Sequence, residues 1–273
     1  MIVLLSPAKR LSPENPQPAS RYTLPENLER SRELVERLRK FSPAKLAELM
    51  DISPELAKLN HQRFQDWTAD FSPEQAQPAI LSFLGDVYQG LDAASLKPAD
   101  LAWAQEHLRI LSGLHGVLRP LDLMKPYRLE MGTGLAIKKA KNLYAYWGEG
   151  PTRQINAALQ ALPGEKPVVL NLASAEYVKV IKPAALEATL INVDFLEFKN
   201  GTFKPIQLFL KQARGYMARW IIQKRITRPE HLAGFAEQGY GYNEAASGPQ
   251  RLVFQRIGSG GVPGAGVRVG LKA

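Results

Sequence analysis

The sequence predicts an α+β fold: a single compact domain with a mixed sheet or a partial barrel and a helical N-terminal half. Short apolar, β-branched runs at residues 2–5 and 168–172 are typical of buried strands. Three Ser-Pro steps between residues 42 and 73 indicate helix starts, because serine caps a helix and proline fits its first turn. A chain of 273 residues with no linker of distinct composition up to residue 256 can build one large core.

The N-terminal half is expected to place one strand before several helices. The strand at residues 2–5 leads into a proline-rich loop, and a charged helix is expected from Asn27 to Lys40. The Ser-Pro steps should start helices that end near Met50, Phe64 and Leu84.

The C-terminal half is expected to alternate strands with one long helix. Residues 143–147 fit either a strand or the start of a helix. Asn200-Gly201 is a hairpin signal. The expected strands are residues 168–172, 190–198, 202–209 and 252–255, and the expected helix is residues 207–226. Residues 257–273 carry six glycines, so we expect a disordered tail after a domain spanning residues 1–256.

The stretch from Leu111 to Pro120 has the pattern of a helix-hairpin-helix. Apolar spacing predicts a helix from Asp100 to Ile110 and a new apolar face from Val117. Glycines at 113 and 116 would let the turn approach a phosphate closely, as non-sequence-specific DNA-binding elements do. The alternative is an ordinary packing corner between two helices.

Positive charge is unevenly distributed along the chain. Lys plus Arg is 35 and Asp plus Glu is 26, which gives a net charge of +9 and favours polyanionic partners. Residues 199–228 contain eight bases and no acid, and Lys211, Arg214 and Arg225 share one stripe of the expected helix. These bases either hold an anion or pair with acids elsewhere in the fold. The candidate nucleic-acid-binding residues are Lys9, Gly113, Leu114, His115, Gly116, Arg119, Lys125, Arg128, Lys211 and Arg214.

Several collinear strings within residues 1–256 resemble the YaaA family of bacterial proteins, which is linked to peroxide stress resistance. They are Leu5–Lys9, Arg21–Pro25, Gly85–Tyr88, Leu111–Gly132, Asn171–Ser174 with Glu176-Tyr177, and Lys211–Gly215. The resemblance implies a single α+β domain with a fold peculiar to the family, a positively charged cleft and a helix-hairpin-helix. It also implies DNA binding, repair under oxidative stress, and protection against damage from free iron.

A second hypothesis places a small-molecule or nucleotide pocket where two expected strands end. Lys9 follows the first strand, while Asn171, Ser174 and Glu176 end or follow the strand at residues 168–172. The Ser6-x-x-Lys9 spacing occurs in penicillin-recognising enzymes, but their companion motifs are missing. Alternatively, Asn171 and Ser174 satisfy a helix N-terminus.

The composition narrows the remaining possibilities. There is no cysteine, and the four histidines show no ligand spacing, so we expect no metal site and no cofactor. We expect no transmembrane helix, no signal peptide and a cytoplasmic location. The sequence therefore predicts a DNA-binding protein of the peroxide stress response that contacts duplex or branched DNA through phosphates. The alternative is an enzyme acting on a nucleotide or nucleic acid near Lys9, Asn171 and Glu176.

Overall fold

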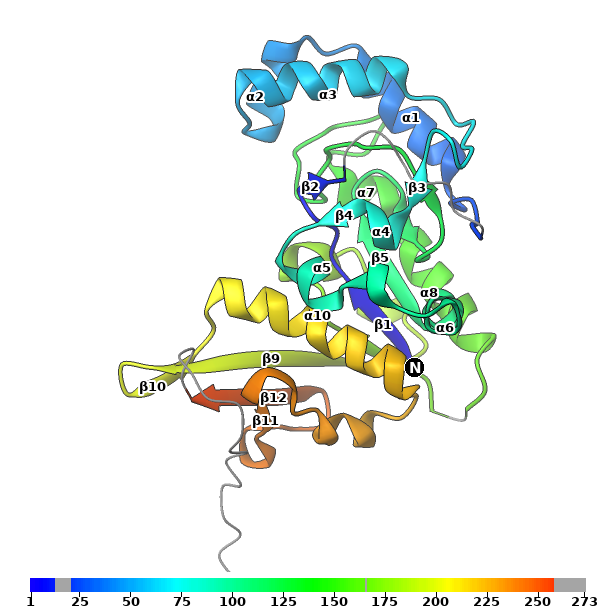
Figure 1. The fold of residues 1–273 in the computed structure, drawn as a ribbon. Coiled ribbons are helices and arrows are strands. Elements are labelled where there is room, and N and C mark those ends of the chain that lie inside the picture. The colour runs from blue at the N-terminus through cyan, green and yellow to red at the C-terminus, as the bar shows by residue number, and fades with distance from the viewer. Residues whose placement is uncertain (13–20, 165, 258–273) are drawn as a thin grey trace, which may run out of the picture.

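The computed structural model describes residues 1–12, 21–164 and 166–257, and its centre is a mixed sheet of eight strands. The strand order is β11-β12-β9-β8-β1-β5-β6, with β10 paired to the outer part of β9 (Figure 1). The strands are β1 (Ile2–Leu5), β5 (Leu108–Ser112), β6 (Gly116–Leu118), β8 (Val168–Asn171), β9 (Thr189–Lys199), β10 (Thr202–Lys204), β11 (Gly241–Tyr242) and β12 (Arg251–Ile257). The predicted α+β class and mixed sheet are confirmed. In the described ranges the sheet stays open, so it is not a partial barrel.

Strand β1 lies at the centre of the parallel part of this sheet. It pairs in parallel with β5 on one side and with β8 on the other, and all four of its residues are buried. A strand covered on both faces has no polar side, which explains the unbroken apolar run Ile2–Leu5.

Helices surround the sheet and build the N-terminal half. They are α1 (Leu28–Arg39), α2 (Pro43–Met50), α3 (Pro54–Asp66), α4 (Ala79–Ser82), α5 (Asp86–Leu91), α6 (Pro98–His107), α7 (Leu143–Trp147), α8 (Gly150–Gln160), α9 (Ala175–Val178) and α10 (Gln207–Lys224). Short 3-10 helices cover residues 93–95, 183–185, 229–234, 237–239 and 244–246. Two small antiparallel ribbons pair β2 (Arg10–Leu11) with β4 (Phe83–Leu84), and β3 (Gln77–Pro78) with β7 (Leu123–Met124).

Two of the three Ser-Pro steps begin helices in the way the sequence predicts. The Ser42 and Ser53 hydroxyls accept hydrogen bonds from the backbone N–H groups of Lys45 and Leu56, at the starts of α2 and α3. The third step, at Ser72, makes only a turn, and the helix expected to reach Leu84 is wrong. Pro78 lies six residues on and lacks the N–H that a continuing helix needs.

The helix-hairpin-helix expected around Leu111–Pro120 is not what these residues form. Helix α6 ends at His107, and Leu108–Ser112 and Gly116–Leu118 are antiparallel strands joined by a three-residue turn. The helix expected from Asp100 is therefore present as α6 but ends three residues before Ile110, and the helix expected from Val117 is wrong. The helical spacing of apolar residues is overridden here by a contact remote in sequence, because residues 108–112 form the strand that pairs with one side of β1.

Other differences lie in the C-terminal half. Residues 143–147 form a helix, α7, capped by the Asn142 side chain, which accepts from the Ala145 N–H at 2.9 Å. Helix α8 was not expected from the sequence. The hairpin at Asn200-Gly201 is confirmed, although β10 stops at Lys204 and α10 begins at Gln207. Of the predicted tail, Ile257 ends β12, and residues 258–273 lie outside the described residues.

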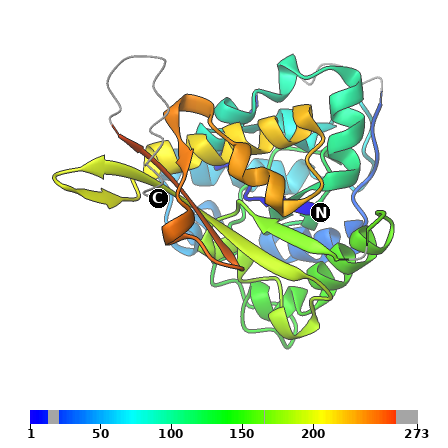
Figure 2. The same cartoon turned by 90° about the horizontal axis from the view of Figure 1, so that it is seen from below.

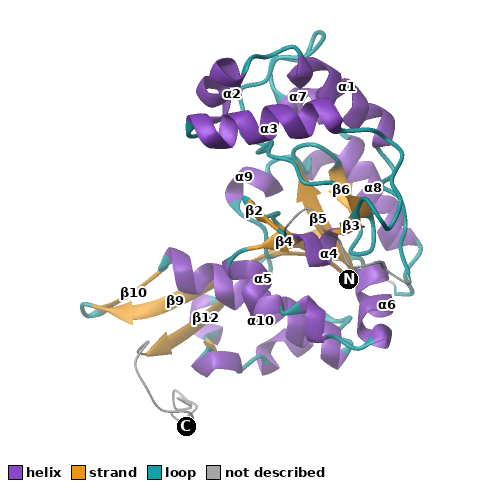
Figure 3. Cartoon of the chain, turned by 45° about the horizontal axis from the view of Figure 1, so that its top comes forward, coloured by secondary structure: helices purple, strands orange, loops and turns teal. Residues whose placement is uncertain are grey.

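The elements are arranged so that two parts of the molecule extend to the same side. Helices α2 and α3 lie at one end, and the β9–β10 hairpin lies at the other, with α9 and β2 between them (Figures 1 and 3). Figure 2 shows how far this hairpin extends past the neighbouring elements. In the described parts, no helix has the length and apolar character needed to cross a bilayer.

Helix α10 crosses α5 at a pair of glycines. A Cβ added at Gly215 would lie 1.9 Å from the carbonyl oxygen of Val87, and one at Gly90 would lie 2.3 Å from that of Gln212. The two backbones touch directly, so only glycine fits either position.

We predict that Gly215→Ala lowers the free energy of unfolding by about 1–3 kcal/mol, because the added methyl group meets fixed backbone on α5. The matched control is Gly134→Ala, whose Cβ would have nothing within 4 Å. Urea unfolding of both variants measures the difference. Equal stabilities would show that α5 and α10 separate without cost.

Candidate functional site

Three parallel strands of the sheet end at one edge, and polar side chains follow at once. Ser6 follows β1, Ser112 ends β5, and Ser174 lies just beyond β8. The Ser6 hydroxyl accepts from the Ser174 N–H at 2.8 Å and lies 3.3 Å from the Ser174 hydroxyl. Tyr88 donates from its hydroxyl to the Ser6 carbonyl at 2.9 Å. The carboxyl ends of β1 and β8 are thus tied together, as is usual where α/β sheets place ligand sites.

Charged groups lie on this edge. The Lys9 ammonium lies 2.9 Å from the Glu130 carboxylate, which also pairs with the Arg128 guanidinium at 3.1 Å. Glu176 accepts from the Gly132 N–H at 2.8 Å. The structure therefore brings Lys9, Ser174 and Glu176 to one edge of the sheet. Sequence reasoning missed Glu130, which joins them through the loop that follows β7.

Asn171 has a different role from the one proposed for it. Its side chain is buried, donates to the Asn192 side chain at 2.8 Å and accepts from the Ala173 N–H at 2.9 Å. Both ends of the amide therefore hold the chain, but the Ala173 N–H precedes α9, so Asn171 does not cap the helix N-terminus that the alternative expected. Lys9, in contrast, is 64% exposed, so its ammonium keeps most of its water.

The turn that carries Gly113, Leu114, His115 and Gly116 lies inside the molecule. Leu114 and His115 are fully buried. A Cβ at Gly113 would lie 2.2 Å from the Leu129 carbonyl oxygen, and Gly116 has φ +72° against the ring of Trp147. The two glycines let other parts of this chain pack closely. The packing-corner interpretation therefore describes this turn, without the two helices.

His115 is held in a small polar network under this turn. Its ring Nδ1 shares a hydrogen bond with the Ser31 hydroxyl at 2.9 Å, and its backbone N–H donates to the Ser112 hydroxyl at 2.9 Å. Ser112 in turn lies 2.6 Å from the Tyr127 hydroxyl. Nε2 has no hydrogen-bond partner in the described ranges. Burial lowers the pKa of His115 to about 3, so the ring stays neutral in the folded protein.

Arg119 and Lys125 are largely committed to contacts within the chain. The Arg119 guanidinium lies 3.0 Å from the buried carboxylate of Asp122 and donates to the Leu24 carbonyl at 3.0 Å. Lys125 donates to the Thr68 hydroxyl at 2.8 Å, and partial burial lowers its pKa.

Some basic residues in and just after helix α10 form ion pairs within the chain, and others are exposed. Arg219 and Arg225 pair with Asp92 and Asp100, at 3.6 and 2.8 Å, as the pairing alternative expected. Arg214 is mostly buried, and that burial lowers its pKa, while the charge of Asp194 acts in the opposite direction. Lys211 alone of the three predicted stripe residues is exposed.

Exposed positive charge also lies on a loop that sequence reasoning used only in part. The basic loop (residues 125–142) joins β7 to α7. In this loop Glu130 pairs with Lys9, and the Gly132 N–H donates to Glu176 on α9. Between residues 125 and 141 it carries five bases and one acid. This local excess was the signal in the sequence. Its exposed bases that pair with no carboxylate of the described residues are Lys139 and Lys141.

These features define a class: a basic α+β protein with charged side chains gathered at the carboxyl edge of a mixed sheet. Residues 1–246 match the family model described as peroxide stress protein YaaA. The chain belongs to this family, which confirms the resemblance read from its motifs. In the ranges that the structure describes, no group of three or more histidine, aspartate or glutamate side chains is placed to hold a metal ion.

We predict that His115 makes the protein less stable as pH falls from about 6.5 to about 3. The unfolded chain takes up a proton at His115 near its ordinary pKa, whereas the folded chain does so only near pH 3. Stability is therefore complete above pH 6.5 and is lost below it, by about 1.4 kcal/mol per pH unit for one proton.

The measurement is urea unfolding between pH 7 and pH 4 for the native sequence and His115→Asn, which can still bond to Ser31. The variant should show a smaller slope of stability against pH. Subtracting the two slopes removes the contribution of His107, whose pKa burial also lowers. Identical slopes would mean that His115 ionises in the folded protein.

Proposed function

We propose that this protein binds duplex or branched DNA through phosphates, without sequence readout, as its part in the peroxide stress response. The contact surface would be the basic face, which we define as Lys9, Arg10, Lys139, Lys141 and Lys179. A protein that covers DNA in this way shields it from peroxide and iron damage, and we propose that it does so in the cytoplasm.

The exposure of these cations is the observation that supports the proposal most. All five side chains are exposed, and four of them have no carboxylate within ion-pair distance in the described residues. Lys9 pairs with Glu130, which it shares with Arg128. Lys179 lies over the ring of Tyr144 at 5.0 Å, so its charge is held at the surface rather than neutralised. Unpaired exposed lysines are the electrostatic footprint of a phosphate-binding surface.

The arrangement of the elements also supports this proposal. Helices α2–α3 and the β9–β10 hairpin extend to the side on which α9 and β2 lie (Figure 3). The hairpin region adds exposed bases at Lys199, Lys204 and Lys211. Lysine contacts to phosphate carry no sequence information, which favours binding to DNA of any sequence.

We predict that Lys139→Glu with Lys141→Glu weakens binding to every duplex sequence alike. Each lost phosphate contact should reduce the slope of log affinity against log salt by about 0.9, so the double variant should lose about 1.8. A matched control is Lys166→Glu with Lys224→Glu, which makes the same change in net charge outside the basic face. Titrations of duplex, bubble and junction DNA at several salt concentrations measure both. Equal losses in the two double variants would show that only net charge matters.

An enzyme acting on a nucleotide or nucleic acid remains the second candidate, because Lys9, Ser174 and Glu176 share one edge. We predict that Lys9→Ala changes stability by no more than about 1 kcal/mol, since its ion pair is exposed. It should weaken DNA binding and peroxide survival together. Survival lost with DNA affinity unchanged would favour the enzyme, because DNA binding would then not explain the defect.

A further inference from the structure

A polar cavity lies at the opposite end of the sheet from the basic face. It has a volume of about 220 Å³ and lies where α6 passes into β5, beside the end of β6 and one face of α8. Its charged lining comes from Glu26, Glu106, Arg109, Arg119 and Asp122. Because β5 runs parallel to β1, this is the amino edge of the strands, remote from Ser6 and Ser174.

Arg109 is the unusual residue in this cavity. It is 8% exposed, and no carboxylate lies within ion-pair distance in the described ranges. Its Nη1 donates to the carbonyls of Gln105 and Leu108, both at 2.8 Å, at the end of α6. Within the described residues, Nε and Nη2 of Arg109 make no hydrogen bond and are not fully enclosed, so they are open to the cavity that Arg109 lines. A buried charge normally has a counter-charge, and here none of the described residues provides one in contact.

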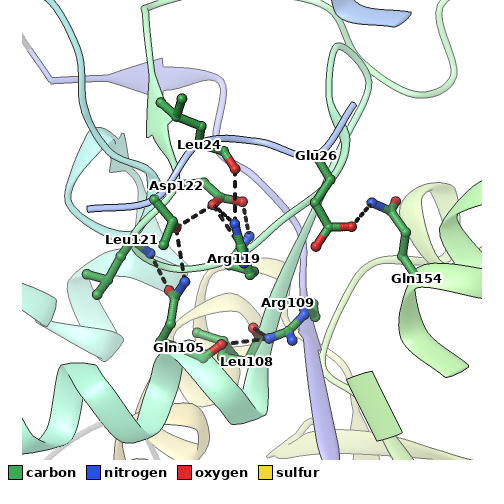
Figure 4. A network of polar contacts seen from close by, with 10 residues as sticks. Leu24, Glu26, Gln105, Leu108, Arg109, Arg119, Leu121, Asp122 and Gln154 are labelled. Atoms are coloured by element: carbon green, nitrogen blue, oxygen red, sulfur yellow. Dashed lines mark hydrogen bonds and ion pairs between the residues drawn. The ribbon is translucent and has the colours of Figure 1, made fainter. Parts of the chain in front are cut away.

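The second arginine of the cavity, Arg119, has its own counter-charge and supplies none for Arg109. Its charge is balanced by Asp122, which accepts from the Arg119 Nε at 3.1 Å and from the Arg119 N–H at 2.8 Å (Figure 4). Burial and the nearby Arg119 charge both lower the pKa of Arg109, although the pKa of such a group stays far above neutral pH. The guanidinium edge of Arg109 therefore fits a carboxylate, which two parallel N–H groups bind as a fork.

Two acidic side chains beside the cavity further restrict the charge of a ligand that it can bind. Glu26 and Glu106 are exposed, and one Glu26 oxygen accepts from the Gln154 amide at 2.8 Å (Figure 4). With Asp122 committed to Arg119, the remaining groups are one guanidinium and two carboxylates. These carboxylates would repel a doubly negative anion such as phosphate. They would not repel a molecule that carries one negative and one positive charge. The cavity volume is below the roughly 300–1,000 Å³ of sites for drug-sized ligands, so a ligand here has few heavy atoms.

We propose that this cavity binds a small zwitterion, with its carboxylate on Arg109 and its ammonium group beside Glu26 and Glu106. The apolar wall of Val117, Ala157 and Ala158 would cover the short carbon chain between the two charges. Nothing in this proposal depends on DNA binding, because the two sites lie at opposite ends of the strands.

The test is binding to the full-length protein by calorimetry and ligand-observed NMR at low salt. The probes are glycine, β-alanine and γ-aminobutyrate, their plain counterparts acetate, propionate and butyrate, and inorganic phosphate. We expect at least one zwitterion to bind saturably and at least about tenfold more tightly than its plain counterpart, as one charge-assisted contact predicts. Stronger binding of phosphate or of the plain acids would overturn the proposal, and so would the absence of saturable binding by all seven probes.

Three variants locate the site. Ala158→Phe should fill the cavity and abolish binding, whereas Ala161→Phe, an exposed position at the end of α8 that does not line it, should not. Glu26→Gln keeps an oxygen for Gln154 and should weaken zwitterion binding about tenfold without weakening binding of the plain acids, because it removes a negative charge that repels them. Binding that survives Ala158→Phe, in a variant whose circular dichroism is native, would place the ligand elsewhere and refute the assignment.

Discussion

The pairing of β1 between β5 and β8 is the constraint on which the rest of the structure depends. Its four residues are buried on both faces, so β1 cannot shift register without moving polar neighbours inside or apolar ones outside. The parallel pairing places the ends of three strands at one edge. Ser6 and Lys9 leave the sheet there, and the basic loop, α9 and the Ser174 backbone contact them. At the opposite ends of these strands, α6 leads into β5, and Arg109 lies at this junction.

The parts of the fold that are encoded locally could be predicted from the sequence. The apolar run of β1, the serine caps of α2 and α3, and the Asn-Gly turn of the β9–β10 hairpin each depend on a few neighbouring residues. The strand Leu108–Ser112 could not be predicted, because its apolar spacing also suits a helix and only the distant β1 decides between them. Pro78 ended a helix that the Ser72-Pro73 step suggested. The errors thus lie where a contact remote in sequence, or a second proline, outweighs a local pattern.

The candidate site shows the same division. Lys9, Ser174 and Glu176 were predictable, because polar residues after apolar strands meet at one edge of a parallel sheet. Glu130 was not, since the basic loop has no periodicity that would place it. The glycine turn was ambiguous for a physical reason: glycine permits close approach by a phosphate and by another segment of the same chain equally well. Burial of Leu114 and His115 decides for the second, and the sequence does not encode burial directly.

The topology of β1 also sets an order of events during synthesis. Val3 pairs with Leu108 and with Leu170, which is made 167 residues later. At a ribosomal rate of about 5–20 residues per second, roughly 8–33 s pass before the second neighbour exists. Until β5 is made these four consecutive apolar residues have no strand to pair with, and one side of β1 stays open until β8 follows; closing such long loops is slow. The strand that organises the native protein is therefore also an apolar segment that the growing chain leaves without both of its neighbours for most of that time.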